Sequence, residues 1–359
     1  MKIITVICWA IAALALAGLA IWFLTGTVFS IGSDELMGDW NIGLNWERLT
    51  GPYEVVGTYT VPISGIDSLD IDWVAGEIIV LPYNGEEISI TESAQRELND
   101  DERLRIGTSG ATLTIKYSAM NMRRMPQKRL EVLVPHALSV NMGTFKADSS
   151  SGSITVSDFS ANAFRAGSVS GAVQLTNITA RMLSTSTTSG SIALTSVYAD
   201  DMKLSSVSGS VRLSDTGAKT LDCNTTSGSI NLFGDFGSAD LNSIGGRITM
   251  ENAATYTTVK ADSTSGAIDL AGSFASADLG SISGSISIRS EIVPSSLKAG
   301  TTSGAIAVTI PNEGPVSVNH SSVSGKLTSD IPLTMQSNGA QFRLSTVSGE
   351  ARILMLVES

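Results

Sequence analysis

Cysteine, histidine and proline are scarce in this 359-residue chain. The two cysteines, Cys8 and Cys223, lie far apart in the sequence, which excludes a disulfide framework and a CxxC metal site. Cys223 stands at an apolar position of its segment, so we expect it to be a small core side chain. None of the nine prolines falls between residues 137 and 293, which leaves the backbone amides of that stretch free to pair in sheets.

Positive charge is also in short supply. The chain has 23 basic and 34 acidic residues, and its net charge of -11 would repel nucleic acids and anionic lipids. The only histidines, His136 and His320, are expected at the surface, and the GxSxG, HExxH, P-loop and GxGxxG motifs are missing. These absences argue against nucleic-acid binding, and they lead us to predict no enzyme activity, no metal site and no cofactor.

One long apolar run is present, at the N-terminus. No charged residue occurs from Ile3 to Leu24, and a helix of this length would span roughly 33 Å, about the thickness of a bilayer core. Lys2 precedes the run and acidic residues follow it, so the positive-inside rule predicts a cytoplasmic N-terminus and an extracytoplasmic chain after about Gly26. We favour an uncleaved transmembrane anchor at residues 1–26 over a signal peptide, followed by a linker at 27–52.

A short motif recurs through the second half of the chain. Ser-Gly, preceded by Ser or Thr and any residue, returns about every 19 residues, and in nearly every copy the second and fourth residues after the glycine are apolar. Apolar residues at every second position are typical of a strand with one buried face. We predict that the repeat glycines are structural, at tight bends or at positive φ: Gly152, Gly171, Gly190, Gly209, Gly228, Gly246, Gly266, Gly284, Gly304, Gly325 and Gly349.

This period predicts an all-β single-chain β-solenoid at residues 141–359, with coils of about 19 residues that each hold two or three short strands. A 38-residue coil stays open as an alternative, because "SVSG" and "TTSG" alternate along the repeat. Residues 53–140 follow a looser β pattern, and we expect an N-terminal cap there. The last strand, from Ala351, is unusually apolar, and we expect it to close the stack or to meet a partner.

Three blocks of sequence carry a family resemblance: "GIDSLDIDWVAGEIIVLPYNGEEISI", "RLEVLVPHAL", and "KADSSSGSITV" with the Ser-Gly series after it. Together they resemble the bacterial β-strand-repeat family of unknown function that is labelled "putative adhesin" and includes proteins linked to cell-envelope stress loci. The resemblance covers roughly residue 53 to the C-terminus. It implies an extracytoplasmic or membrane-associated β-solenoid, and it supplies no catalytic residues.

Acidic residues are the candidates for chemistry, because many β-solenoids cleave polysaccharides with aligned carboxylates. Asp148 and Asp262 occupy equivalent places six coils apart, too distant to share a site. Asp240 and Asp278 are two coils apart, roughly 10 Å at the usual strand spacing, which suits a solvated ladder better than an acid/base pair. One basic cluster is present and is expected to be a solvated loop or, less favoured, a contact for an anionic polymer or lipid: Arg123, Arg124, Lys128 and Arg129.

The sequence as a whole favours a non-enzymatic module for binding, adhesion or scaffolding in the bacterial cell envelope. We expect one transmembrane helix to hold it in the cell membrane with the repeats outside. A cell-wall glycan or another envelope protein is the expected partner, and nucleic acid is not. The main alternative is a polysaccharide lyase or hydrolase, and a polymerising cytoplasmic solenoid is a third.

Overall fold

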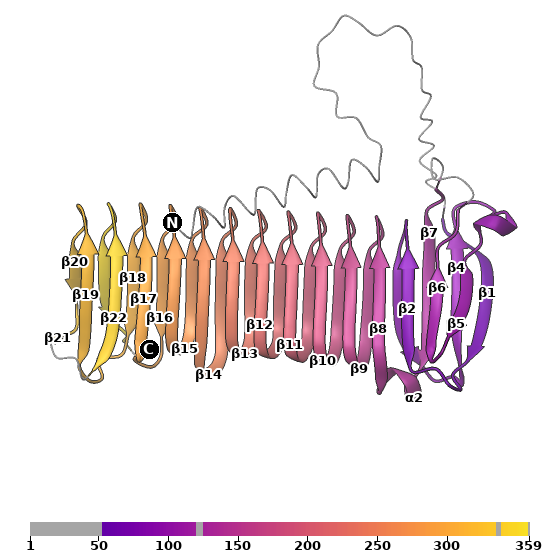
Figure 1. Cartoon of the computed structure of the whole chain (residues 1–359), viewed down its shortest axis with the longest axis horizontal. Coiled ribbons are helices and arrows are strands. Elements are labelled where there is room, and N and C mark those ends of the chain that lie inside the picture. The colour runs from indigo at the N-terminus through magenta and orange to yellow at the C-terminus, as the bar shows by residue number, and fades with distance from the viewer. Residues whose placement is uncertain (1–51, 120–124, 335–338, 358–359) are drawn as a thin grey trace, which may run out of the picture. The chain divides into compact units, whose positions relative to one another are not determined.

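The computed structural model describes residues 52–119, 125–334 and 339–357 (Figure 1). These residues form an all-β solenoid, and the only helices within them are the short segments η1 (Asp100–Glu102) and α2 (His136–Ser139). Within the same ranges, no helix has the length and apolar character needed to cross a bilayer. The anchor predicted at residues 1–26 and nearly all of the linker predicted at 27–52 lie outside the described residues.

Seven long strands form the regular part of the solenoid and stack side by side in chain order (Figure 1). Each pairs in parallel with the next, and the register from β10 to β11 is 19 residues, as in Val173↔Ile192 and Thr187↔Ser206. The 19-residue coil is therefore confirmed, and the 38-residue alternative is wrong because neighbouring copies pair. The strands are β9 (Ile154–Ser168), β10 (Val173–Thr187), β11 (Ile192–Ser206), β12 (Val211–Thr225), β13 (Ile230–Ser243), β14 (Ile248–Ser263) and β15 (Ile268–Ser281).

A left-handed residue bends each of the first four long strands near its middle. The φ angles at Asp158, Asn177, Ser196 and Asp215 lie between 51° and 64°, in a region that Asp and Asn tolerate better than most residues. Each coil thus has a leading segment before the bend, such as residues 173–176, and a trailing segment after it, such as 182–187. The two or three separate strands expected per coil are here one continuous strand with a corner. Leading segments stack into a leading sheet, trailing segments into a trailing sheet, and their inward side chains share one core.

At the N-terminal end, antiparallel strands follow the last parallel ones. β2 and β3 continue the stack next to β8 and β9, and β6 and β7 follow them in parallel. Beyond these, β4 pairs antiparallel with β7 and β1, and β5 pairs antiparallel with β6. The strands are β1 (Glu54–Pro62), β2 (Ser68–Trp73), β3 (Ile78–Tyr83), β4 (Glu87–Ala94), β5 (Arg105–Ser109), β6 (Thr112–Lys116), β7 (Lys128–Pro135) and β8 (Met142–Ser149).

The last two coils at the C-terminal end stack in the reverse of their chain order. β22 lies between β17 and β19, and β23 lies between β18 and β20. The prediction that the strand from Ala351 closes the stack is therefore wrong, since the coil of β19 and β20 is the outermost one. The strands are β16 (Ile286–Ser290), β17 (Ser296–Thr301), β18 (Ile306–Ile310), β19 (Val316–Ser322), β20 (Leu327–Ser329), β21 (Leu333–Thr334), β22 (Ala340–Thr346) and β23 (Ala351–Met355).

Candidate functional site

The eleven repeat glycines form one column at the turn between trailing and leading segments. A Cβ added to Gly209 would lie 1.8 Å from the carbonyl oxygen of Gly190, and the other ten glycines would meet a neighbouring glycine oxygen at 1.7–2.0 Å. None of the eleven has a positive φ, so the expected left-handed backbone is not the reason for glycine here. The reason is the close approach of one turn to the next, which leaves no room for a side chain.

A column of hydroxyl groups lies beside the glycines, three residues before each of them. Ser168 accepts a hydrogen bond from the Gly171 N–H at 2.9 Å and donates one to the Gly152 carbonyl at 2.9 Å. Thr187 donates to the Gly190 carbonyl at 2.6 Å. These hydroxyls satisfy turn backbone groups that the core would otherwise leave unpaired. The sequence signal for this column is the Ser or Thr that begins each four-residue turn, a position for which no role was predicted.

Charged side chains of opposite sign alternate on the outer surface of the trailing sheet. Asp240, Lys260 and Asp278 stand in one row on successive coils, so a lysine separates the two aspartates. Lys260 Nζ lies 3.6 Å from Asp240, and Lys298 Nζ lies 3.0 Å from Asp278. The two carboxylates are therefore ion-paired with lysines, as in a surface ladder, and do not face each other as an acid/base pair.

Asp148 and Asp262 stand in a second outward row, six coils apart in the register of the sheet. Asp148 Oδ2 lies 3.5 Å from Lys146, and Asp262 Oδ2 lies 3.4 Å from Lys260. Each aspartate thus has a partner within its own part of the ladder, and the two do not meet. Among the described residues, no group of three or more His, Cys, Asp or Glu side chains is placed to hold a metal ion.

A shallow groove of about 580 Å³ runs across the trailing sheet from β8 to β13. It lies between two outward rows of side chains, one containing Met182 and Asp201 and the other containing Arg165, Lys203 and Asp222. The rims carry charges of both signs, and Met182 is 41% exposed. Because the groove crosses successive strands, it offers an extended ligand a similar contact about every 4.8 Å. The groove was not predicted from the sequence, since its rims combine residues from separate coils.

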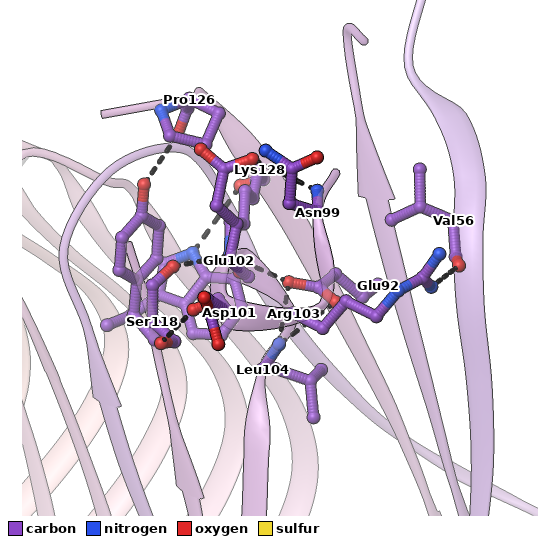
Figure 2. A network of polar contacts seen from close by, with 12 residues as sticks. Val56, Glu92, Asn99, Asp101, Glu102, Arg103, Leu104, Ser118, Pro126 and Lys128 are labelled. Atoms are coloured by element: carbon purple, nitrogen blue, oxygen red, sulfur yellow. Dashed lines mark hydrogen bonds and ion pairs between the residues drawn. The ribbon is translucent and has the colours of Figure 1, made fainter. Parts of the chain in front are cut away.

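Lys128 is the centre of a buried polar network at the N-terminal end (Figure 2). Its Nζ lies 2.9 Å from Glu92, donates to the Ser118 carbonyl at 2.8 Å and to the Glu102 carbonyl, and sits 4.2 Å from the centre of the Tyr117 ring. Both side chains of the ion pair are fully buried. Burial lowers the pKa of Lys128, and the hydrogen bond to Glu92 opposes that shift. The network joins β4, β7 and the segment around η1.

The predicted basic cluster is thus split. Lys128 is a buried structural residue, which corrects the expectation of a solvated loop, because β4 and the η1 segment fold over it. Arg129 is partly exposed and pairs with Glu77 at 2.9 Å. Arg123 and Arg124 lie outside the described residues.

Of the remaining candidates, His136 is exposed at the start of α2, as expected. His320 is not a surface corner residue, because it lies within β19 on the inward side, in register with the buried Leu344. Its Nε2 atom is buried and has no hydrogen-bond partner. Cys223 is buried and free, and burial raises the pKa of its thiol. The thiol is therefore a core side chain rather than a nucleophile.

Comparison with protein-family models shows which family the chain belongs to. A family model described as Toastrack DUF4097 matches residues 66–270 and 235–353. The chain belongs to the Toastrack DUF4097 family. This assignment confirms the resemblance stated from the sequence, and the link of some members to envelope stress loci remains an expectation.

Several solved structures match most of this Toastrack chain at low sequence identity. A "putative adhesin" from Parabacteroides distasonis is 12% identical, with 84% of this chain and 98% of that one covered and a TM-score of 0.39. One from Bacteroides fragilis is 13% identical, covering 85% and 97%, with a TM-score of 0.31. A "putative lipid binding protein" from Parabacteroides distasonis is 14% identical, covering 84% and 97%, with a TM-score of 0.37. None of the curated proteins compared with the chain matches it.

Proposed function

We propose that this Toastrack protein is a non-enzymatic binding module of the bacterial cell envelope, acting in adhesion or scaffolding. Its solenoid stands outside the membrane, and residues 1–26 anchor it with the N-terminus in the cytoplasm. The uncharged run from Ile3 to Leu24, with Lys2 before it, supports this placement. Residues 27–52 serve as the linker.

The groove on the trailing sheet is the observation that carries the proposal. It extends across successive strands in the stacking direction, and its rims carry Asp side chains together with Lys or Arg side chains. Such a groove suits an extended, hydroxyl-rich polymer whose hydroxyl groups can hydrogen-bond to both the acidic and the basic side chains. A cell-wall glycan fits this description best. Another envelope protein is the second class of ligand.

Catalysis is not part of the proposal, because Asp240 and Asp278 are each paired with a lysine and are separated by Lys260. A general acid with a raised pKa and a nearby base would require a different arrangement of carboxylates.

The test measures binding of the full-length protein, in detergent micelles, to an array of cell-wall polymers and glycans, with the same samples assayed for released sugar. We expect binding without release. Ser184→Trp, which fills the groove from its half-exposed rim, should weaken binding at least tenfold. Ser214→Trp is the matched control, since Ser214 is similarly exposed on the leading sheet and should leave binding unchanged.

Two outcomes would overturn the proposal in different ways. Released sugar would support the polysaccharide-active alternative, and Asp240→Asn and Asp278→Asn would then be the variants to assay. Binding that Ser184→Trp leaves intact would place the ligand elsewhere on the solenoid.

Protease digestion of intact cells tests the location separately, because a cytoplasmic solenoid would be protected.

A further inference from the structure

The C-terminal end of the stack has an incompletely paired edge. β22 pairs with β19 along one side from Val316 to Ser322, whereas β21 pairs with the other side only at Val316 and Ser317. Within the described residues, no strand pairs with the outer side of β19 from Val318 to Ser322. A strand edge of this kind presents backbone donors and acceptors to another chain.

Inward side chains of the same coil are left partly open. Val318, His320 and Ser322 are half-buried, although they occupy the core positions of β19. Their partners one coil further in, Phe342, Leu344 and Thr346, are 2%, 0% and 3% exposed. One more layer of chain on top of β19 would complete the burial of these three positions.

His320 adds a polar signal to the apolar one. Its Nε2 is buried and has no hydrogen-bond partner. The next two coils have Leu344 and Ala299 at the same core position. A buried imidazole nitrogen without a partner costs free energy. The core of the outermost coil therefore contains a polar atom without a partner, whereas the coil of β22 has Leu344 at the same position.

We propose that this open end docks onto the same end of a second copy of the chain, with the two β19 strands paired antiparallel about a two-fold axis. An edge strand is complementary to itself in this arrangement, because each copy offers the donors and acceptors that the other lacks. The end also carries little charge for a chain of net charge -11. Its charged residues, Glu313, Lys326 and Asp330, sum to -1, so two ends do not repel strongly.

The opposite end of the stack favours closure at a dimer. There the edge strands β1 and β5 are each antiparallel to their neighbour; β1 has a register shift between Val55 and Gly57 and ends at Pro62, and β5 is only five residues long. Bulges and prolines are features that protect edge strands from further pairing. A copy docked by its C-terminal end therefore presents no second end of the same kind, and the assembly stops at two chains.

Cross-linking of the full-length protein tests the geometry. Asn319→Cys and Ser321→Cys, each in a Cys8→Ala background, place a thiol on the exposed side of β19, close to the proposed axis. We expect at least one of them to form disulfide-linked dimers in detergent micelles under mild oxidation. Thr195→Cys, exposed in the middle of the stack, is the control and should remain monomeric on a non-reducing gel. The absence of dimers for both β19 variants would overturn the proposed pairing.

Sedimentation equilibrium of the full-length protein tests the energetics. Asn319→Lys places two like charges across the axis without touching the core, and we expect the dimer dissociation constant to rise at least tenfold. Val318→Lys, which points inward, should have the same effect, and Thr195→Lys should have none. A wild-type chain that stays monomeric at all concentrations, or a dimer that tolerates both β19 lysines, would contradict the proposal. The result does not depend on glycan binding, since β19 lies outside the groove.

Discussion

Two adjacent glycines, Gly245 and Gly246, differ in the space around them. A Cβ on Gly246 would lie 1.9 Å from the Gly228 oxygen, whereas one on Gly245 would be no closer than 3.7 Å to any atom outside its neighbours. We therefore expect Gly246→Ala to push two coils apart and to lower the free energy of unfolding by about 3 kcal/mol. Urea denaturation followed by circular dichroism measures the change.

Gly245→Ala is the control for this prediction, and it should change the free energy of unfolding by no more than a few tenths of a kcal/mol. It lies in the same turn and adds the same atom. Equal effects of the two substitutions would show that the glycine column does not act through close approach.

Glu102 makes stability depend on pH. Arg96 forms two hydrogen bonds with this carboxylate, at 2.7 and 2.8 Å, and lowers the pKa of Glu102 from 4.5 to about 2. Between these two pKa values the unfolded chain therefore binds more protons than the folded chain. The contribution of Glu102 to stability is complete above pH 4.5 and is lost as the pH falls through about 2.

The wild type should lose on the order of 2 kcal/mol of unfolding free energy as the pH falls from 4.5 to 2, and we expect Glu102→Gln to abolish this loss. Thermal unfolding at several pH values compares the variant with the wild type. Glu97→Gln is a control on an acidic residue of the same loop. A wild-type profile that Glu102→Gln leaves unchanged would argue against the Arg96 contact.

At the scale of strands, the reversed order of the last two coils changes which strands are protected. β22 lies between two strands, whereas β19 has an open side, although β22 is nearer to the chain terminus. We expect the backbone amides of β22 to exchange hydrogen more slowly than those of β19. Hydrogen exchange followed by mass spectrometry checks this at low protein concentration, where the proposed dimer dissociates. Protection that falls steadily towards the C-terminus would contradict the observed strand order.

For the whole molecule, the coil is the unit that can be removed. Deleting residues 192–210 removes one coil and lets β10 pair with β12 in the existing register, since Val173, Ile192 and Val211 are aligned. We expect this protein to fold with an unchanged β spectrum by circular dichroism and a modestly lower melting temperature.

Deleting residues 192–209 is the matched control. It removes 18 residues instead of 19, so the side chains that follow would exchange their inward and outward positions. This variant should expose apolar surface and aggregate, and a stable fold from it would show that the register is not fixed by the buried face.

Much of this architecture followed from the sequence alone. The spacing of the glycines and the apolar residues two and four places after them determined the 19-residue coil, because the buried face of a strand repeats every two residues and stacked coils must align. Corner positions such as Asn177 were not predicted, although they recur every 19 residues, because Asp, Asn and Ser adopt a left-handed φ in only a minority of their occurrences.

Only the tertiary structure decided the features that depend on distant segments. Gly325 and Gly349 occupy equivalent turns, so local sequence did not show which of them stacks on Gly304, and the structure places Gly349 there. Lys128 lies in a stretch of sequence that reads as a solvated basic loop. It is buried because Glu92, 36 residues away, supplies a compensating charge. The groove likewise combines side chains from six strands. Local patterns specify the coil, and contacts between coils specify the ends and the surface.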